Sequence, residues 1–401
     1  MDLSFSPEDE QYRERLRSWL GAHSARLDDA AGVMRGAGAS NIMEALQAAR
    51  DWQRTLWEAG YVGMAWPKAY GGQDASLTEQ VIVAEEFARV STPPLINTIG
   101  LTILGPPRIP HGTDAQRSRF LPRILAAEEL WCQGFSEPAS GSDLASLSTR
   151  AVVDGDELVV NGQKVWTSMA PIADWCFMLV RTDPAAPKRE GISYLLCDMK
   201  SPGITVRPLR NAAGGIHFSE VFFDDVRVPL TGLVGDLHGG WQIARTTLEH
   251  ERSGLSSVLA LEQTLGRLVS LARRVERSGR PAIEDQGVRR RLAQRWIEVE
   301  GLRHLGYRTL SAQISGATDA TSSSVGKLFA SDLRQRLAQL ALETEGPLAP
   351  VARRSPHVVD RGRWHAAYFD ALGHAIGGGT SEILHNAIAE RVLGLPRSTQ
   401  D

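Results

Sequence analysis

Apolar residues recur at helical spacing through the first third of the chain. Near the N-terminus, Leu16, Trp19 and Leu20 fall on one face of a 3.6-residue repeat. Residues 5–8 precede this repeat and offer an apolar staple residue, a serine N-cap, a proline and an acid, which is typical of a helix start. Similar patterns follow, and we expect an N-terminal α-helical domain over residues 1–127.

Beyond this domain the apolar period shortens to the alternation that is typical of strands. The β-rich runs are separated by Asp154-Gly155 and by Asn161-Gly162, and both dipeptides predict tight hairpin turns. No helical pattern interrupts these runs. We therefore expect a central antiparallel, β-barrel-like domain over residues 128–238.

The helical period then returns and holds nearly to the C-terminus. Long amphipathic helices that would pack together are expected over 241–276, 287–314, 325–345 and 380–393. These form a C-terminal four-helix bundle domain over residues 239–401. The fold class is therefore α+β multidomain, with helical, β and helical domains in that order.

Composition narrows the class of protein without naming it. A chain of 401 residues with 42% hydrophobic content supports two to three domains with sizeable cores. The formal charge of −3 is dispersed, so we expect no nucleic-acid groove and no polybasic membrane patch. We expect no membrane span and no signal peptide, because no run of 18 apolar residues occurs and the N-terminus is acidic.

The three cysteines, Cys132, Cys176 and Cys197, lack the spacing of metal ligands, and each lies in an apolar run. Buried, reduced thiols indicate a cytoplasmic protein. The ten histidines are scattered, so no metal site is predicted. The glycine runs do not follow a strand of a βαβ unit and no GxSxG elbow occurs, which disfavours a Rossmann dehydrogenase or a hydrolase.

Small and hydroxyl-bearing residues concentrate in "FSEPASGSDL", residues 135–144. Free backbone N–H groups there would suit a phosphate or the edge of a heteroaromatic ring, although an ordinary interdomain turn has the same composition. The neighbouring "NGQKVWTS" carries Trp166, and a tryptophan there is more often a core residue than the wall of a cofactor site. Three glycines before Thr380 resemble a helix start that holds an anion.

Glu249 and Arg252 are neighbours at i, i+3 on a predicted helix, whereas Glu251 faces another direction. Taken alone, such residues are more typical of a solvated, salt-bridged face than of a catalytic role.

Four segments in this order resemble signatures of the acyl-CoA dehydrogenase family of flavoenzymes, and the resemblance covers nearly the whole chain. They are "CQGFSEPASGSDLASL", "VNGQKVWTSMAPIADWCFMLVRTD", "FSEVFFDDVRVP" and "IGGGTSEILHNAIAERVLGLPR". Two further segments, "GYVGMAWPKAYGGQDASLTEQ" and "GISYLLCDMKSPGITVRPLR", are similar to a bacterial branch that includes sterol side-chain and other unusual acyl-CoA substrates. The resemblance implies FAD between the β domain and the C-terminal bundle, with a neighbouring subunit completing the site.

The chemistry that the resemblance implies is α,β-desaturation of an acyl thioester. The α proton is removed as the β hydrogen leaves as hydride to flavin N5, and electrons then pass to an electron-transfer flavoprotein. The thioester is one of coenzyme A or of an acyl carrier protein. The chain is expected to form a homodimer or homotetramer, and a heterotetramer is also open.

The resemblance assigns roles to residues of the first two segments. Phe135 and Ser136 match positions at the pyrimidine edge of the isoalloxazine. Gly141 and Ser142 match positions near the FAD pyrophosphate, and Ser142 also matches one that faces the pantetheine arm of the substrate.

Further positions match the cofactor-binding set. Trp166 matches the residue that shields the flavin, with Thr167 and Ser168 beside it. Gly346 matches a cofactor-binding glycine, and Thr380 and Glu382 match FAD contacts at a helix start.

The general base is the point at which this chain departs from many relatives. Those members carry a glutamate where this chain has Gly378, while isovaleryl-type and long-chain-type enzymes carry the base directly before an arginine on the first bundle helix. The match is Glu251, followed by Arg252, which we assign to substrate binding. Desolvation would raise the pKa of such a carboxylate. Gly378 would keep a role through its backbone amide, which in family members binds the thioester carbonyl.

Two alternatives stay open at this stage. The chain can be a flavin monooxygenase or oxidase on the same fold, or a non-catalytic partner subunit that shapes the site of a catalytic paralogue in a mixed tetramer. Lack of a glutamate at Gly378 is compatible with both, whereas Glu251 favours a dehydrogenase.

Overall fold

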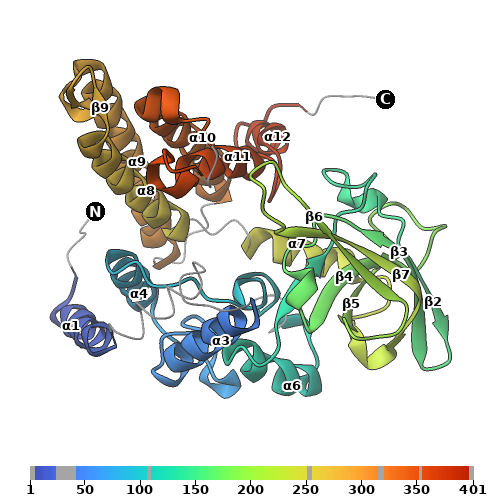
Figure 1. Cartoon of the computed structure of the whole chain (residues 1–401). Helices are drawn as coiled ribbons and strands as arrows, with labels where there is room; N and C mark the ends of the chain where they lie inside the picture. The colour runs from blue at the N-terminus through green and yellow to red at the C-terminus, as the bar shows by residue number, and fades with distance from the viewer. Residues whose placement is uncertain are drawn as a thin grey trace. The chain divides into compact units, whose positions relative to one another are not determined.

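The computed structural model of the chain describes residues 5–23, 42–105, 110–250, 255–314, 320–351 and 355–396 (Figure 1). The chain forms two compact units. The first contains Met1–Asn211 and Ile216–Glu251, and the second contains Ala212–Gly215 and Arg252–Asp401. Each unit is described by itself below.

The first unit begins with helices, as the sequence predicts. They are α1 (Pro7–Ala22), α3 (Ile42–Glu58), α4 (Leu77–Arg89) and α6 (Asp114–Leu125). The expected helix start is confirmed, because the Ser6 hydroxyl accepts a hydrogen bond from the Asp9 amide at 3.1 Å and Pro7 is the first helical residue. Leu16 and Leu20 are buried in the shared core.

Among the described residues, eight strands form the sheet of the first unit, in the order β6-β7-β3-β2-β4-β5-β8, with β1 pairing with β4. Their bounds are β1 Trp131–Gly134, β2 Arg150–Asp154, β3 Glu157–Lys164, β4 Trp175–Arg181, β5 Ile192–Asp198, β6 Ile204–Leu209, β7 Phe218–Pro229 and β8 Leu233–Val234. The pairings are antiparallel except that β4 runs parallel to β1 and to β2. The central β domain that the sequence predicts is therefore present.

One of the two predicted hairpin turns is correct. Asp154 pairs with Glu157, so Gly155 lies in a tight turn between β2 and β3. The prediction for Asn161-Gly162 is wrong, because both residues lie inside β3, where the register shifts in a β-bulge. Glycine is required at this bulge, since a Cβ on Gly162 would lie 2.6 Å from the Thr149 hydroxyl oxygen.

The three cysteines lie on adjacent strands of this sheet. Cys132 of β1 is in register with Cys176 of β4, which is in register with Cys197 of β5. All three are buried and free, as predicted from their apolar surroundings. Burial raises the pKa of Cys197 beyond the range of an ordinary thiol, so it stays protonated and unreactive.

Helix α7 (Gly240–His250) also belongs to the first unit and packs on β5. Its approach is close, because a Cβ on Gly240 would lie 2.5 Å from the backbone of Ser193.

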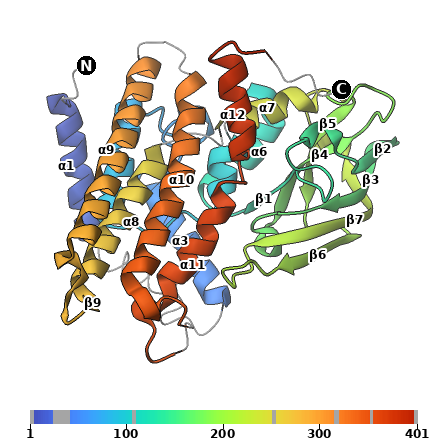
Figure 2. The same ribbon diagram turned by 90° about the horizontal axis from the view of Figure 1, so that it is seen from above.

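The second unit is a bundle of long helices. They are α8 (Leu255–Arg274), α9 (Gln286–Ile314), α10 (Ala320–Glu345), α11 (Arg363–His374) and α12 (Ser381–Arg391), with a short β9–β10 hairpin (Glu276–Arg277 and Arg280–Pro281) after α8. Figure 2 shows α8, α9, α10 and α11 side by side. Leu268, Leu333, Leu337 and Trp364 are in its core.

The pattern anticipates α12 but not α11. Helix α11 buries Trp364 and Ala371 against α10, while α12 packs on α10 through Leu384. Only two residues of α11 are buried, Trp364 and Ala371. Two apolar positions seven residues apart are too few to reveal a helical period, and the segment before them is rich in proline and arginine.

Within the described ranges, every helix is too short or too polar to cross a membrane.

Candidate active site

The two polar segments of the β region are joined by a buried ion pair. The Lys164 ammonium at the end of β3 lies 2.8 Å from a carboxylate oxygen of Glu137 and 3.2 Å from the Phe135 carbonyl. The Val165 amide donates to the Ser136 carbonyl at 2.9 Å, so the loop after β1 is tied to the end of β3 through backbone as well. The two segments therefore act as one structural element.

Glu137 is the centre of this element. Its carboxylate also accepts hydrogen bonds from the Ser148 amide at 2.6 Å, the Ser148 hydroxyl at 2.8 Å and the Thr149 amide at 2.9 Å. Burial opposes ionisation, but the charge of Lys164 and these hydrogen bonds outweigh it and lower the pKa of Glu137 to about 2. The carboxylate is therefore ionised and fully partnered.

Sequence reasoning did not single out Glu137 or Lys164. Lys164 is fully buried, and burial lowers its pKa. One signal was available: Lys164 is one of only five lysines in the chain and ends a strand whose alternate residues, Leu158 and Val160, are buried. A lysine on the buried face of a strand requires a partner, and Glu137 is the acid in the neighbouring polar loop.

The predicted residues of the loop after β1 differ in exposure. Phe135 is buried beside Phe177 and Tyr194, and Ser136 is half-buried. Gly141 and Ser142 are exposed, and within the described residues neither amide donates a hydrogen bond. Unpaired N–H groups on a rigid loop suit an anionic ligand.

Trp166 lies in solvent rather than in the core. It follows the buried ion pair at φ +60°, its side chain is 62% exposed, and its ring meets that of Phe218 edge to face at 6.0 Å. A large aromatic residue held in a left-handed conformation and exposed is a functional-site feature rather than a packing feature. The core interpretation of Trp166 is therefore wrong.

Thr167 and Ser168 continue this edge. Thr167 is fully buried and exchanges two backbone hydrogen bonds with Ser219, at 3.0 and 3.1 Å. The hydroxyls of Thr167 and Ser219 are both buried, and neither has a hydrogen-bond partner among the residues described. A buried hydroxyl without a partner is costly, and a bound ligand is one way to satisfy it. Ser168 is half-buried beside them.

A second group of predicted residues lies in the second unit, between α11 and α12. Gly378 and Gly379 have φ angles of +67° and +97°, which only glycine adopts without strain. The Thr380 hydroxyl caps α12 by accepting from the Ile383 amide at 3.2 Å. Among the described residues the Gly378 amide donates no hydrogen bond, so it is available to a ligand.

Glu382 lies in the first turn of α12 and is exposed. Its own backbone amide and the Thr380 hydroxyl lower its pKa, so the carboxylate is ionised. Gly346 lies at φ +60° directly after α10, and a side chain there would meet no atom within 4 Å. Its backbone is therefore open to approach.

Glu251 and Arg252, the predicted base and its neighbour, lie outside the described residues. The preceding helix, α7, is described as far as His250, with side chains as far as Leu248.

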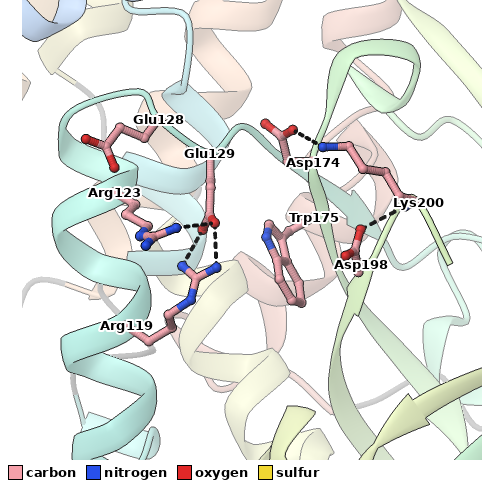
Figure 3. Close-up of a pocket in the computed structure, with 8 residues that line it drawn as sticks. All are labelled: Arg119, Arg123, Glu128, Glu129, Asp174, Trp175, Asp198 and Lys200. Atoms are coloured by element: carbon pink, nitrogen blue, oxygen red, sulfur yellow. Dashed lines mark hydrogen bonds and ion pairs between the residues drawn. The ribbon is translucent and has the colours of Figure 1, made fainter.

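A cavity of about 270 Å³ in the first unit contains none of the predicted residues. Figure 3 shows Arg119 and Arg123 directed toward Glu129, and Lys200 toward Asp174, around the ring of Trp175. The ion pairs are short, at 2.6 Å for Arg119 and Glu129 and 3.2 Å for Lys200 and Asp174. Because these charges neutralise one another, the cavity is better explained as a structural ion-pair network than as a catalytic centre.

Known proteins match the chain over nearly its full length. Residues 6–128 match the acyl-CoA dehydrogenase N-terminal domain, residues 132–226 its middle domain and residues 238–393 its C-terminal domain. The acyl-CoA dehydrogenase IpdE1 of Mycobacterium tuberculosis is 38% identical over 393 residues, covering 98% of this chain and 99% of that protein.

Solved structures agree. A chain of the ChsE4-ChsE5 complex from Mycobacterium tuberculosis has a TM-score of 0.83 and 32% identity, covering 99% of this chain and 100% of its own. The Tcur3481-Tcur3483 steroid ACAD has a TM-score of 0.84 and 29% identity, with coverage of 99% and 100%. With all three domains matched in order, the chain belongs to the acyl-CoA dehydrogenase family of enzymes.

Proposed function

We propose that this chain is an FAD-dependent acyl-CoA dehydrogenase that desaturates an acyl thioester between its α and β carbons. The observation that carries the proposal is Trp166, an aromatic residue 62% exposed, beside a loop in which the amides of Gly141 and Ser142 have no partner among the described residues. Such a platform fits a planar heteroaromatic ring better than it fits a purely structural role.

The residues of this chain fit FAD chemically. Phe135, Ser136, Trp166, Thr167 and Ser168 would meet the isoalloxazine, and the buried, unpaired Thr167 hydroxyl supports a polar ligand at this edge. Gly141 and Ser142, whose amides have no partner in the part of the chain that the structure describes, would bind the pyrophosphate. Thr380 and Glu382 at the start of α12, together with Gly346, complete the proposed cofactor set. When bound, FAD would accept the hydride that the substrate loses.

The chain's own residues would then handle the proton and the thioester. Glu251 takes the α proton as the carbon–carbon double bond forms and the β hydrogen leaves with its electron pair. The Gly378 amide donates to the thioester oxygen, where negative charge develops. Ser142 and Arg252 would contact the substrate. Gly378 itself has no side chain that could serve as base.

A bulky, steroid-type acyl group is the proposed substrate class. A chain of 29% identity and full coverage is described as a steroid ACAD, and the resemblance to IpdE1 extends over the whole length. We propose coenzyme A as the thiol carrier and an electron-transfer flavoprotein as the acceptor, following the family chemistry.

A mixed assembly is the second candidate. The ChsE4-ChsE5 structure is a complex of two differently named chains, and this chain lacks the side-chain base at Gly378. In that case a second, related chain would complete the site.

The test begins with the purified chain alone, its flavin spectrum and anaerobic bleaching by octanoyl-CoA, isovaleryl-CoA and the CoA thioester of a C24 steroid acid. Bleaching by one thioester is the expected result. Glu251→Gln should slow it about 10²–10⁴-fold, whereas the control Glu262→Gln, on α8 and half-buried, should not.

Other outcomes separate the alternatives. Normal bleaching in Glu251→Gln would exclude that residue as base. Absence of bound flavin, restored by co-expression with a related chain, would favour the mixed assembly. Turnover that requires oxygen and an external flavin reductase would favour a monooxygenase.

A further inference from the structure

One face of α10 is directed at the glycine loop. Lys327, Ser331 and Arg334 stand at i, i+4 and i+7, so they lie on the same side of the helix. The loop, residues 374–380, joins α11 to α12 and contains Gly378, whose amide is unpaired among the described residues.

Two side chains of this face contact backbone carbonyls of the loop. The Lys327 ammonium donates to the Gly379 carbonyl at 2.7 Å. The Ser331 hydroxyl lies 3.0 Å from the His374 carbonyl and 2.9 Å from the Lys327 carbonyl within α10, and can donate its single proton to either. Both ends of the loop are therefore within reach of one helix.

The loop is also closed upon itself. The Ser381 amide donates to the Ala375 carbonyl at 3.1 Å, and the Gly377 amide to the Gly373 carbonyl at 3.0 Å. Between these closures, Gly378 and Gly379 have no side chains that could fix their peptide planes by packing. Glycine loses the most conformational freedom on ordering, so the Lys327 hydrogen bond restrains a part of the loop that is otherwise costly to order.

Positive charge accumulates on the same side. Arg334 is half-buried, and within the described residues no carboxylate pairs with it. His374 keeps part of its surface exposed, yet desolvation of its ring and the charges of Arg334 and Lys327 lower its pKa to about 4, so the imidazole is neutral at pH 7. Lys327 and Arg334 therefore supply the local charge.

We propose that Lys327 is a positioning residue for the reaction: through the Gly379 carbonyl it holds the Gly378 amide in the orientation that receives the thioester oxygen. This inference rests on the proposed function. It adds that the charge of Lys327 favours negative charge developing on that oxygen. Lys327 itself contacts neither substrate nor flavin.

Four variants test this role. Lys327→Met removes the donor and the charge, Lys327→Arg retains both, and Ser331→Ala removes only the hydroxyl. Lys200→Met, an exposed lysine of the first unit, is the matched control for loss of a lysine charge.

The first readout does not depend on catalysis. Hydrogen exchange of the peptide spanning residues 374–384 should become about 10-fold faster or more in Lys327→Met, less so in Ser331→Ala, and stay unchanged in Lys200→Met. Lys327→Arg should keep exchange near that of the unchanged chain.

The second readout is the rate of flavin reduction by the thioester that bleaches the unchanged chain. Lys327→Met should lower it about 10–100-fold while thioester affinity and flavin content change less than about 3-fold. Lys327→Arg should recover most of the rate.

Two results would overturn the inference. One is unchanged loop exchange and reduction in Lys327→Met, and the other is a rate loss that Lys327→Arg fails to recover. If Lys327→Met does not fold, Lys327→Ala decides, because it also removes the donor to the Gly379 carbonyl, and unaltered loop exchange and rate in that variant would contradict the role. If no thioester reduces the unchanged chain, the proposed function fails, while the exchange experiment still reports on the loop.

Discussion

The two groups of candidate residues expose backbone to a ligand by different physical means. In the first unit, the loop that carries Ser142 is fixed by the buried Lys164–Glu137 pair, with every carboxylate oxygen partnered. In the second unit, the loop around Gly378 is held by hydrogen bonds from the half-buried Lys327 and the buried Ser331 of one helix. One loop is anchored by buried charge and the other is only tethered.

The difference teaches where each loop is vulnerable. A buried charge that loses its partner destabilises the whole surrounding core. A tethered glycine loop can loosen without unfolding anything else. Changes in the first loop should therefore appear as lost stability, and changes in the second as lost local order.

The largest effect is expected from Lys164→Met. It leaves the Glu137 carboxylate buried without its cation and should lower stability by about 3–5 kcal/mol. The midpoint of urea unfolding, followed by the circular dichroism of the sheet, measures this. Glu137→Gln added to Lys164→Met should recover part of the loss. A single variant as stable as the unchanged chain would contradict anchoring by charge.

Glu345 provides the next test, because it is a buried carboxyl that pairs with no cation among the described residues. It lies at the end of α10, and one of its oxygens has no hydrogen-bond partner among the described residues. Burial, and then the nearby charge of Asp360, raise its pKa to about 7. The folded state therefore keeps a proton that the unfolded chain releases above its ordinary pKa of 4.5. The stabilising contribution of protonated Glu345 to the free energy of unfolding is therefore fully present below pH 4.5 and is lost as pH rises through 7.

Glu345→Gln should accordingly raise the free energy of unfolding at pH 8 by at most about 3 kcal/mol, and this gain appears as a higher thermal midpoint. At pH 5 the substitution should change the midpoint little. The opposite sign holds for Glu137, whose pKa is lowered to about 2. Its contribution is present above the ordinary carboxyl pKa of 4.5 and is lost as pH falls through 2. A gain for Glu345→Gln that is equal at pH 5 and pH 8 would contradict the assignment.

The smallest effect on stability is expected from Gly378→Ala. A side chain at φ +67° costs about 1–2 kcal/mol, and the strain should stay within the loop. Gly373→Ala, on the exposed side of α11 with no atom near its added methyl group, is the matched control and should stabilise slightly. Thermal melting together with thioester binding distinguishes the two. Gly378→Ala with unchanged binding would argue against a ligand at that amide.

Much of the fold was predictable because it depends on local patterns. The Ser6 cap and the turn at Gly155 follow from the residue types present at those positions. Asn161-Gly162 has the residue types of a turn, yet it forms a bulge inside β3, where Thr149 approaches Gly162 closely. That approach depends on tertiary contacts, which the dipeptide itself does not encode.

The candidate site divides in the same way. Exposed elements such as Trp166 and the Thr380 cap lie in recognisable segments. The Glu137–Lys164 pair and the contacts of Lys327 join residues 27 and 52 positions apart. No local pattern encodes such pairs, because the partners are set by the topology, which brings the loop after β1 to the end of β3 and α10 to the glycine loop.

The row of cysteines gives the molecule a built-in reporter. All three thiols of the chain belong to the first unit and are sealed within its sheet, while the second unit contains none. A thiol reagent can therefore react only when that sheet opens. The rate at which the reagent modifies these thiols would therefore measure the opening rate of the first unit alone, without a label or a substitution.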